Sequence, residues 1–287
     1  MRAKTLLMAM LILAGCAAAP RPPEPPRLKA ALEAESDGAK RYGRGDYAVA
    51  ARRFDEAARI YASIDDTPGA ARNRLHLARS ELAQGRAEAA LLALELAERS
   101  ADAGRTLDIL LIKAQAQLAL DRRAAAQQSL AAASGQCAGA CPQAASLHLL
   151  QARAALADRH AADALAHAEA ALKLLQGKDE AAEAGNAWRL IAAARLANGD
   201  AGNALPAAHA ALEIDRRLAL PEKIARDWLL IGDIQKRVGA GGTAAAYQRA
   251  LDVASAAGLS DIARIATQAL AEDEVSVKAN AGSSGVK

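Results

Sequence analysis

The chain has 287 residues and a formal charge of +3, from 36 lysines and arginines against 33 aspartates and glutamates. Charges of both signs are interspersed along it, which argues against nucleic acid as a partner, because such binding needs a concentrated basic surface. Aromatic residues are limited to two tryptophans, four tyrosines and one phenylalanine, and alanine dominates the apolar fraction. Runs of alternating β-branched residues are missing, so we expect closely packed helices rather than a sheet.

The first fifteen residues have the pattern of a secretory signal. Arg2 and Lys4 precede an apolar run that is about half the roughly 20 residues needed to span a membrane. The run ends in Leu13-Ala14-Gly15-Cys16, which resembles the bacterial lipobox. The resemblance implies that residues 1–15 are removed and that Cys16 becomes the acylated N-terminus of a lipoprotein. An ordinary signal peptide that contains a cysteine is the alternative.

Residues 16–30 follow as a second segment. In Gram-negative lipoproteins of this kind, aspartate after the cysteine tends to retain the protein at the inner membrane, so Ala17 implies export to the outer membrane. Five of the nine prolines of the chain lie in AAAPRPPEPPRLKA. Such a sequence favours polyproline II, at about 3.1 Å per residue, and could reach on the order of 40 Å. We expect a semi-rigid tether that holds a domain off the membrane.

A pattern of small residues then repeats along residues 31–275. Six predicted turn positions recur every 36 to 40 residues: Gly45, Gly85, Asp121, Arg159, Gly199 and Gly239. Small residues lie seven positions before, five after and twelve after each of them. In the last repeat one residue is missing, because Ala250 fits the third column better than Leu251. Antiparallel helices approach closely only where side chains are small, so the pattern predicts helical hairpins.

These units resemble the tetratricopeptide repeat (TPR). The fifth and sixth match best, with Trp188, Ala192, Gly199, Ala204 and Ala211 in one and Trp228, Gly232, Gly239, Tyr247 and Ala250 in the other. The third and fourth are weaker, with Lys113 and Gln151 where leucine is usual. The Asp-Pro that normally closes each unit is missing throughout.

The resemblance implies an all-α fold, a right-handed α-solenoid of about six TPR-like helical hairpins over residues 31–275. Residues 259–275 are expected to form a C-terminal capping helix, and residues 276–287 a disordered tail. In the fifth repeat, Pro206 could kink a helix. We favour an N-cap at Asn203, which would place Pro206 in the first turn, where proline is tolerated.

Cys137 and Cys141 lie in the predicted loop between the third and fourth repeats. Two nearby cysteines in an oxidising periplasm usually form a disulfide, and the glycine- and alanine-rich segment allows the required Cα approach. We predict a structural disulfide that contributes roughly 2 kcal/mol or less, because the loop it closes is short. A metal site with His148 would lack an evident fourth ligand. A redox role is disfavoured by the CxxxC spacing.

Catalytic motifs are missing from the sequence: there is no HExxH, no phosphate-binding loop and no GxSxG. Paired carboxylates such as Asp65-Asp66 fall in loops or at helix ends. We therefore expect a protein that is not an enzyme, with no metal, no cofactor and no small-molecule substrate. An enzyme acting on cell-wall glycans or peptides is the competing hypothesis. A buried cluster of ionisable groups with strongly shifted pKa values would revive it.

The TPR resemblance also implies a concave groove lined by the first helix of each hairpin. Its usual lining positions correspond here to Arg72, Arg79, Asp108, Gln115, Ser146, Arg153, Asn186, Arg189, Arg226, Asp233 and Lys236. Arginine predominates, and guanidinium groups suit acidic side chains or a C-terminal carboxylate on a peptide. The alternative is that these residues are solvated faces of amphipathic helices.

These features predict a periplasm-facing adaptor, anchored in the outer membrane through Cys16, that binds a protein or peptide partner of the cell envelope. Envelope or secretion-system assembly is the expected setting. The architecture is similar to that of type IV pilus pilotins and of lipoproteins that activate peptidoglycan synthases. A structural spacer between outer membrane and peptidoglycan is the alternative, and it predicts no loss of function when the groove arginines are changed together.

Overall fold

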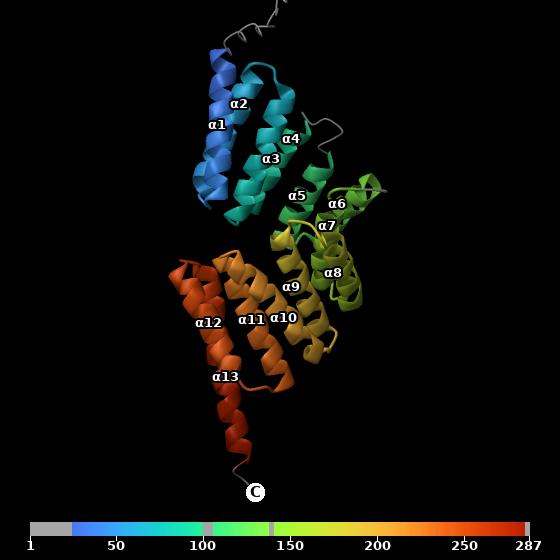
Figure 1. The fold of residues 1–287 in the computed structure, drawn as a ribbon, viewed down its shortest axis with the longest axis vertical. Helices are drawn as coiled ribbons and strands as arrows, with labels where there is room; N and C mark the ends of the chain where they lie inside the picture. The colour runs from blue at the N-terminus through green and yellow to red at the C-terminus, as the bar shows by residue number, and fades with distance from the viewer. Residues whose placement is uncertain (1–24, 100–105, 138–140, 285–287) are drawn as a thin grey trace, which may run out of the picture.

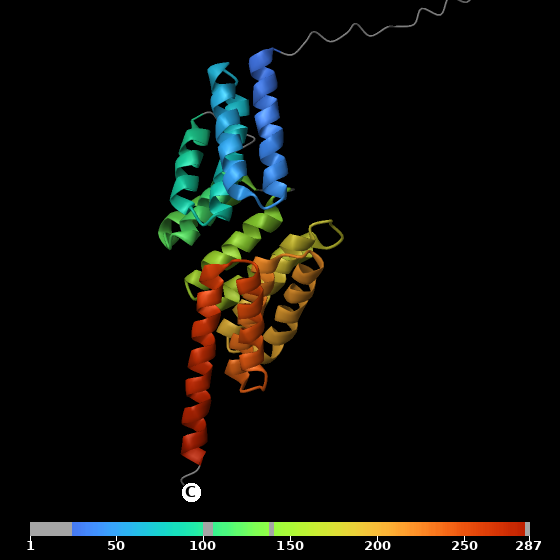
Figure 2. The ribbon, with the colours of Figure 1, turned by 90° about the vertical axis from the view of Figure 1, so that its left-hand side faces the viewer.

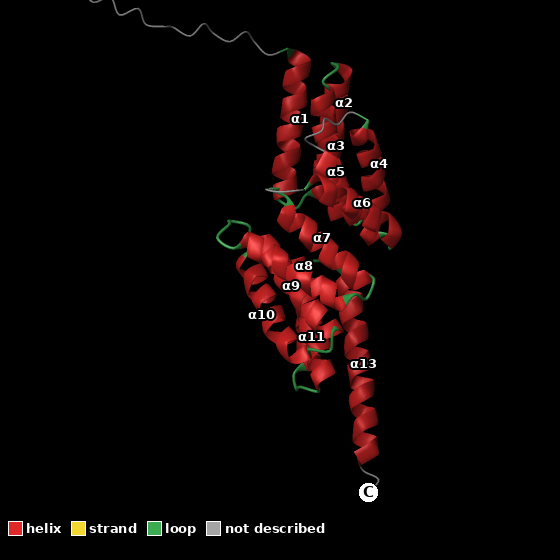
Figure 3. Ribbon diagram, turned by 90° about the vertical axis from the view of Figure 1, so that its right-hand side faces the viewer, coloured by secondary structure: helices red, strands yellow, loops and turns green. Residues whose placement is uncertain are grey.

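The computed structural model describes residues 25–99, 106–137 and 141–284, and within these ranges all regular structure is helical (Figures 1 and 3). The helices there are α1 (Pro26–Gly43), α2 (Tyr47–Ser63), α3 (Thr67–Ala83), α4 (Ala87–Glu98), α5 (Thr106–Ala119), α6 (Arg123–Gln136), α7 (Ala144–Ala157), α8 (Ala161–Leu175), α9 (Ala181–Ala197), α10 (Ala201–Arg217), α11 (Pro221–Val238), α12 (Thr243–Ala256) and α13 (Ser260–Ser284). The prediction of an all-α fold is confirmed.

Consecutive helices pair into six hairpins, from α1–α2 to α11–α12, and α13 packs against α12 and α11 at the end of the stack. The six predicted turn residues each connect the two helices of one hairpin. All six have positive φ: Gly45 (82°), Gly85 (74°), Asp121 (54°), Arg159 (62°), Gly199 (82°) and Gly239 (66°). Glycine adopts this conformation without a side-chain clash, whereas Asp121 and Arg159 adopt it at an energetic cost.

The small residues lie between the paired helices, as predicted. Four alanines of the first column have no exposed surface: Ala78, Ala114, Ala152 and Ala192. In the first hairpin a Cβ on Gly38 would lie 2.9 Å from Cδ1 of Phe54, so the aromatic ring of the second helix occupies the space of a side chain. In the sixth hairpin Ala250 is buried and Ala244 is exposed, which confirms the one-residue offset.

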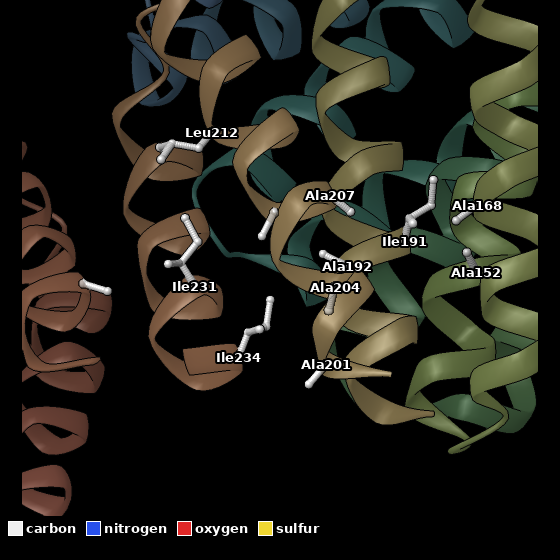
Figure 4. Close-up of a cluster of buried hydrophobic side chains, with 12 residues drawn as sticks. Ala152, Ala168, Ile191, Ala192, Ala201, Ala204, Ala207, Leu212, Ile231 and Ile234 are labelled. Atoms are coloured by element: carbon white, nitrogen blue, oxygen red, sulfur yellow. The ribbon is translucent and has the colours of Figure 1, made fainter. Parts of the chain in front are cut away.

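Apolar burial is divided into local clusters along the stack. The largest runs from α7 and α8 through α9, α10 and α11 to α12, and includes Ala168, Ile191 and Ile231 (Figure 4). A separate cluster joins α5, α6 and α7 around Leu130 and Leu147. Each hairpin is therefore stabilised mainly by its immediate neighbours, as in other solenoids.

Both ends of the domain differ from the predicted boundaries. Helix α1 begins at Pro26, inside the segment expected to be a tether, because proline at the first helical position needs no hydrogen-bonded N–H. Helix α13 continues to Ser284, beyond the expected end at residue 275. Residues 272–281 contain neither proline nor glycine, so nothing in their sequence stops the helix. Figure 2 shows its last turns extending past the other helices.

The position of Pro206 also differs from the prediction. Helix α10 is capped by Asp200, whose carboxylate accepts a hydrogen bond from the Asn203 amide, so Pro206 lies in the interior of the helix. Proline there cannot donate to the carbonyl four residues earlier. The helix continues regardless, and the Arg195 guanidinium donates to the Asn203 carbonyl at 3.1 Å, close to the proline.

None of the described helices is long and apolar enough to cross a membrane. Cys16 and the predicted signal sequence lie outside the described residues, so the predicted lipid anchor stays a prediction.

Candidate partner-binding surface

The residues of the predicted groove all lie on the first helices of the hairpins. From α3 to α11 each of these helices contacts the next one in the series, α5, α7, α9 and α11. We call the side chains that α3, α5, α7, α9 and α11 present at the predicted groove positions the A-helix surface. The structure places the eleven predicted residues on these five helices but leaves only some of them open to a partner.

Arg72 is engaged within the protein. Its Nε and Nη2 donate to the two carboxylate oxygens of Glu35 on α1, at 2.7 and 2.8 Å. Glu35 also accepts from the Tyr61 hydroxyl at 2.9 Å and from the Asn73 amide at 3.2 Å. Burial raises the pKa of Glu35, but these hydrogen bonds outweigh it and lower the pKa to about 2. Arg72, predicted as a residue of the partner-binding groove, therefore joins the first two hairpins and has its donors engaged by Glu35.

The next groove positions form a loose pair and an open site. Arg79 of α3 lies 3.8 Å from the Asp108 carboxylate of α5, and both side chains are more than a third exposed to solvent. Such an exposed pair contributes at most about 1 kcal/mol. Gln115 on α5 is exposed. This part of the A-helix surface can exchange its internal contacts for contacts with a partner.

Arg153 is the open cation at the centre of the surface. Its side chain is exposed, and no described carboxylate pairs with it. Surrounding protein lowers the pKa of its guanidinium, and the positive charge of Arg226, two hairpins further on, lowers it again. Arg226 is held by Glu222 on its own helix, at 3.0 and 3.1 Å. The two guanidinium groups therefore repel each other, and Glu222 compensates the charge of Arg226 but does not pair with Arg153.

Arg189 lies in a buried ion cluster instead. Its Nε donates to Asp227 at 2.6 Å, its Nη2 donates to Asp215, and its Nη1 donates to Asn186 at 3.0 Å. Both aspartates are completely excluded from solvent, and the Arg189 side chain is 18% exposed. Arg189 and Asn186 thus serve the interface between the last two hairpins, which corrects their assignment as partner-binding residues.

Of the two charged residues at the end of the surface, one is engaged within the protein and the other is open to solvent. Asp233 accepts a hydrogen bond from the Tyr247 hydroxyl at 2.8 Å, and burial raises the pKa of its carboxyl. Lys236, one helical turn further along α11, is exposed. Lys236 is therefore open to a partner, whereas Asp233 is tied to α12.

Sequence reasoning missed the acceptors that hold these arginines. Asp215 follows the predicted small residue Ala211 by one helical turn, so its place on the buried face was available from the repeat pattern. Glu35 lies three residues before the predicted small residue Gly38 and could have been placed in the same way. An acidic residue on the packed face of a predicted hairpin is the signal for such a site.

Cys137 and Cys141 form a disulfide with a Cα–Cα distance of 5.2 Å, as predicted. It connects the end of α6 to the segment that leads into α7. His148, the third member of the considered metal site, pairs instead with His167 of α8, with 3.1 Å between their Nδ1 atoms. In the described part of the chain no group of three or more His, Cys, Asp or Glu side chains is arranged to hold a metal ion.

Known protein-family models and curated proteins give no match to this chain. Solved structures do. A chain of the APC/C hetero-tetramer Cut9–Hcn1 is similar with a TM-score of 0.66 and 16% identity, covering 83% of this chain and 43% of that one. A signal-transduction ATPase with a tetratricopeptide repeat sensor from Pyrococcus horikoshii has a TM-score of 0.63 and 12% identity, and the match covers 83% of this chain and 36% of that one. The apo form of RapI has a TM-score of 0.61 and 13% identity, and the match covers 86% of this chain and 72% of that one.

The chain spans less than half the length of the first of these proteins, and at these identities the likeness concerns the fold alone. Together with the six hairpins and their turn residues, it establishes an all-α solenoid of the tetratricopeptide type. Folds of this type are suited to protein–protein interaction, because stacked hairpins present an extended surface.

Proposed function

We propose that this chain is a non-catalytic, lipid-anchored adaptor of the bacterial cell envelope that holds an acidic segment of a partner protein on its A-helix surface. The outer membrane, with the solenoid in the periplasm, is the proposed location. The lipobox at Leu13–Cys16 and the proline-rich segment support the anchor. The disulfide is consistent with an oxidising compartment.

The observation that carries the binding proposal is Arg153. It is exposed near Arg226, and no described carboxylate neutralises it. An acidic side chain or a terminal carboxylate would form charge-assisted hydrogen bonds there and would relieve the repulsion between the two guanidinium groups. Gln115 and Lys236 extend this polar surface toward either end of the stack.

The observation that favours the enzyme hypothesis is the buried cluster at Arg189, because it is a buried group of ionisable residues with a shifted pKa. Burial raises the pKa of Asp227 to about 6, with Arg189 opposing the rise and Asp215 adding to it. Both carboxylates have no exposed surface, however, so neither can touch a substrate in this state. The cluster connects three helices, which favours a structural role over acid–base catalysis.

The test is crosslinking in cells followed by mass spectrometry of the captured proteins. We expect Arg153→Glu with Arg226→Glu to lose a discrete set of envelope proteins while keeping wild-type helicity. The matched control is Arg52→Glu with Arg217→Glu, which reverses two exposed arginines on second helices and should retain capture.

Unchanged capture by the Arg153/Arg226 variant, or equal loss in the control, would contradict the groove assignment. Cys16→Ala addresses the anchor separately. It should release the protein from the membrane fraction and abolish the acyl group on its N-terminal peptide. Absence of specific capture by any form, including the wild type, would favour the spacer alternative.

A further inference from the structure

We propose that Asp227 holds a proton that it donates to Asp215 and that these two residues, with Arg189, form a proton-binding latch that holds the fifth and sixth hairpins together. The inference concerns the stacking of the hairpins and does not depend on the proposed partner.

The geometry leaves one place for such a proton. Arg189 of α9 donates to one oxygen of Asp215 on α10 and to both oxygens of Asp227 on α11, the second at 3.4 Å. The other oxygen of Asp215, Oδ1, is buried and has no hydrogen-bond donor. The same guanidinium group bridges the two aspartates, and the charge of Asp215 acts on the Asp227 carboxyl. A proton on Asp227 would supply the missing donor, because a buried carboxylate oxygen without a partner is unfavourable.

The local charge leads to the same conclusion. The ionisable groups that act on this site are Arg189 and Glu183 of α9, Asp215 of α10, and Lys223 and Asp227 of α11. Fully ionised, they carry three negative charges and two positive ones. One added proton makes the group neutral, and a neutral group is favoured where water is excluded.

Lys223 cannot replace the proton. Its Nζ donates to the Ala182 carbonyl at 3.4 Å, and burial, the largest effect on it, lowers the pKa of its ammonium group. Gly185 lies directly against Asp215, since a Cβ there would be 3.0 Å from Oδ1. On this side the backbone of α9 packs against the carboxylate and offers no donor to Oδ1, whereas a proton on Asp227 would.

The first two hairpins contain the same site without the proton. Glu35, Tyr61 and Asn73 precede Arg189, Asp215 and Asp227 by one constant interval of 154 residues (189 − 35, 215 − 61 and 227 − 73). At Glu35 the two flanking residues are neutral donors, and both donate to the central carboxylate. At Arg189 the two flanking residues are acids, so the site has a spare acceptor and titrates.

Because burial raises the pKa of Asp227 to about 6, the latch should release its proton between about pH 5 and pH 7. Release would leave two ionised carboxylates with one guanidinium and weaken the contacts of α11 with α9 and α10. Asn186 and Arg226 lie on α9 and α11, so the same event would loosen the C-terminal part of the A-helix surface.

Amide hydrogen exchange on the full chain between pH 5 and pH 8, corrected for the intrinsic rate, tests the latch. In the wild type we expect protection of α10 and α11 to fall at least threefold across this range, while α2 and α3 stay unchanged. Asp227→Asn imitates the protonated carboxyl and should make protection independent of pH. The control Asp252→Asn removes an exposed carboxylate and should keep the wild-type dependence.

Equal pH dependence in Asp227→Asn and the wild type, or none in the wild type, would overturn the proposal. Should Asp227→Asn fail to fold, carboxyl ¹³C chemical shifts of the wild type decide the question directly. A midpoint near pH 6 for the Asp227 carboxyl supports the latch, and a midpoint below pH 5 would refute it.

Discussion

The two ends of the solenoid use the same position for opposite chemistry. Near the N-terminus a carboxylate, Glu35, is surrounded by donors, and near the C-terminus a guanidinium, Arg189, is surrounded by acceptors. In the middle, the corresponding residues are Leu149, Leu175 and Ala187, which share one apolar cluster. The repeat therefore fixes where a buried contact between hairpins forms, whereas the side chains decide whether it is apolar, fully compensated or dependent on a proton.

The largest effect should come from removing the cation of the C-terminal site. Arg189→Met would leave two buried carboxylates without the guanidinium that donates to both, and we expect a loss of about 3–5 kcal/mol in the free energy of unfolding at pH 8. The loss should be smaller at pH 5, because the Asp227 carboxyl, whose pKa is raised by burial, can then be protonated. Urea unfolding followed by circular dichroism measures it. Arg59→Met, at an exposed pair with Asp55, should cost less than about 1 kcal/mol.

A smaller effect is expected at the N-terminal site. Glu35→Gln keeps the size of the side chain but removes the charge that receives Arg72, Tyr61 and Asn73, which should cost about 2 kcal/mol at pH 7. Hydrogen exchange should show the loss in α1 to α3 only. A cost equal to that of the exposed control Glu33→Gln would mean that the site contributes nothing to stacking.

Lowering the pH should destabilise the N-terminal site at Glu35 and stabilise the C-terminal site at Asp227. The pKa of Glu35 is lowered on folding, so its contribution is present above about pH 4.5 and is lost as the pH falls toward 2. The pKa of Asp227 is raised on folding, so its contribution is present below about pH 4 and is lost as the pH rises through 6. Exchange protection in α1–α3 and in α10–α11 should therefore change in opposite directions with pH. A parallel change would contradict the comparison.

The smallest change in the free energy of unfolding should come from removing the disulfide in the middle of the stack. Replacing Cys137 and Cys141 by serine removes a bridge over a short loop, so we expect a cost of about 1 kcal/mol, confined to the ends of α6 and α7. Thermal unfolding with and without reductant gives the same comparison on the wild type. A large, global loss would show that the central junction depends on the bridge.

Repeat spacing was enough to predict the hairpins, because the turn residues and the buried alanines follow from backbone geometry alone. Gly45 and Ala152 are set by a left-handed turn and by a close helix contact, and both signals are visible in the sequence. The state of the groove arginines was not predictable in this way. Arg153 and Arg189 lie on equivalent helices, but Arg189 occupies the position of the buried Leu149, one turn before the position of Arg153, and there it meets Asp215 and Asp227 of the neighbouring helices.

Helix ends are less well predicted from the sequence, because they too depend on contacts outside the helix itself. Asn203 and Asp200 are both suitable caps, and the choice depends on where the chain leaves the preceding turn. At α13 the small and polar composition predicts disorder after residue 275, but residues 272–281 contain neither proline nor glycine and the helix continues to Ser284.

The arrangement of the two ends has a mechanical consequence. Helix α1 begins at one end of the long axis and α13 finishes at the other (Figure 2). Any tension between the ends would pass through every hairpin interface in series, so each would carry the full load. The stack should therefore unfold stepwise under force, one hairpin at a time, starting at its weakest junction.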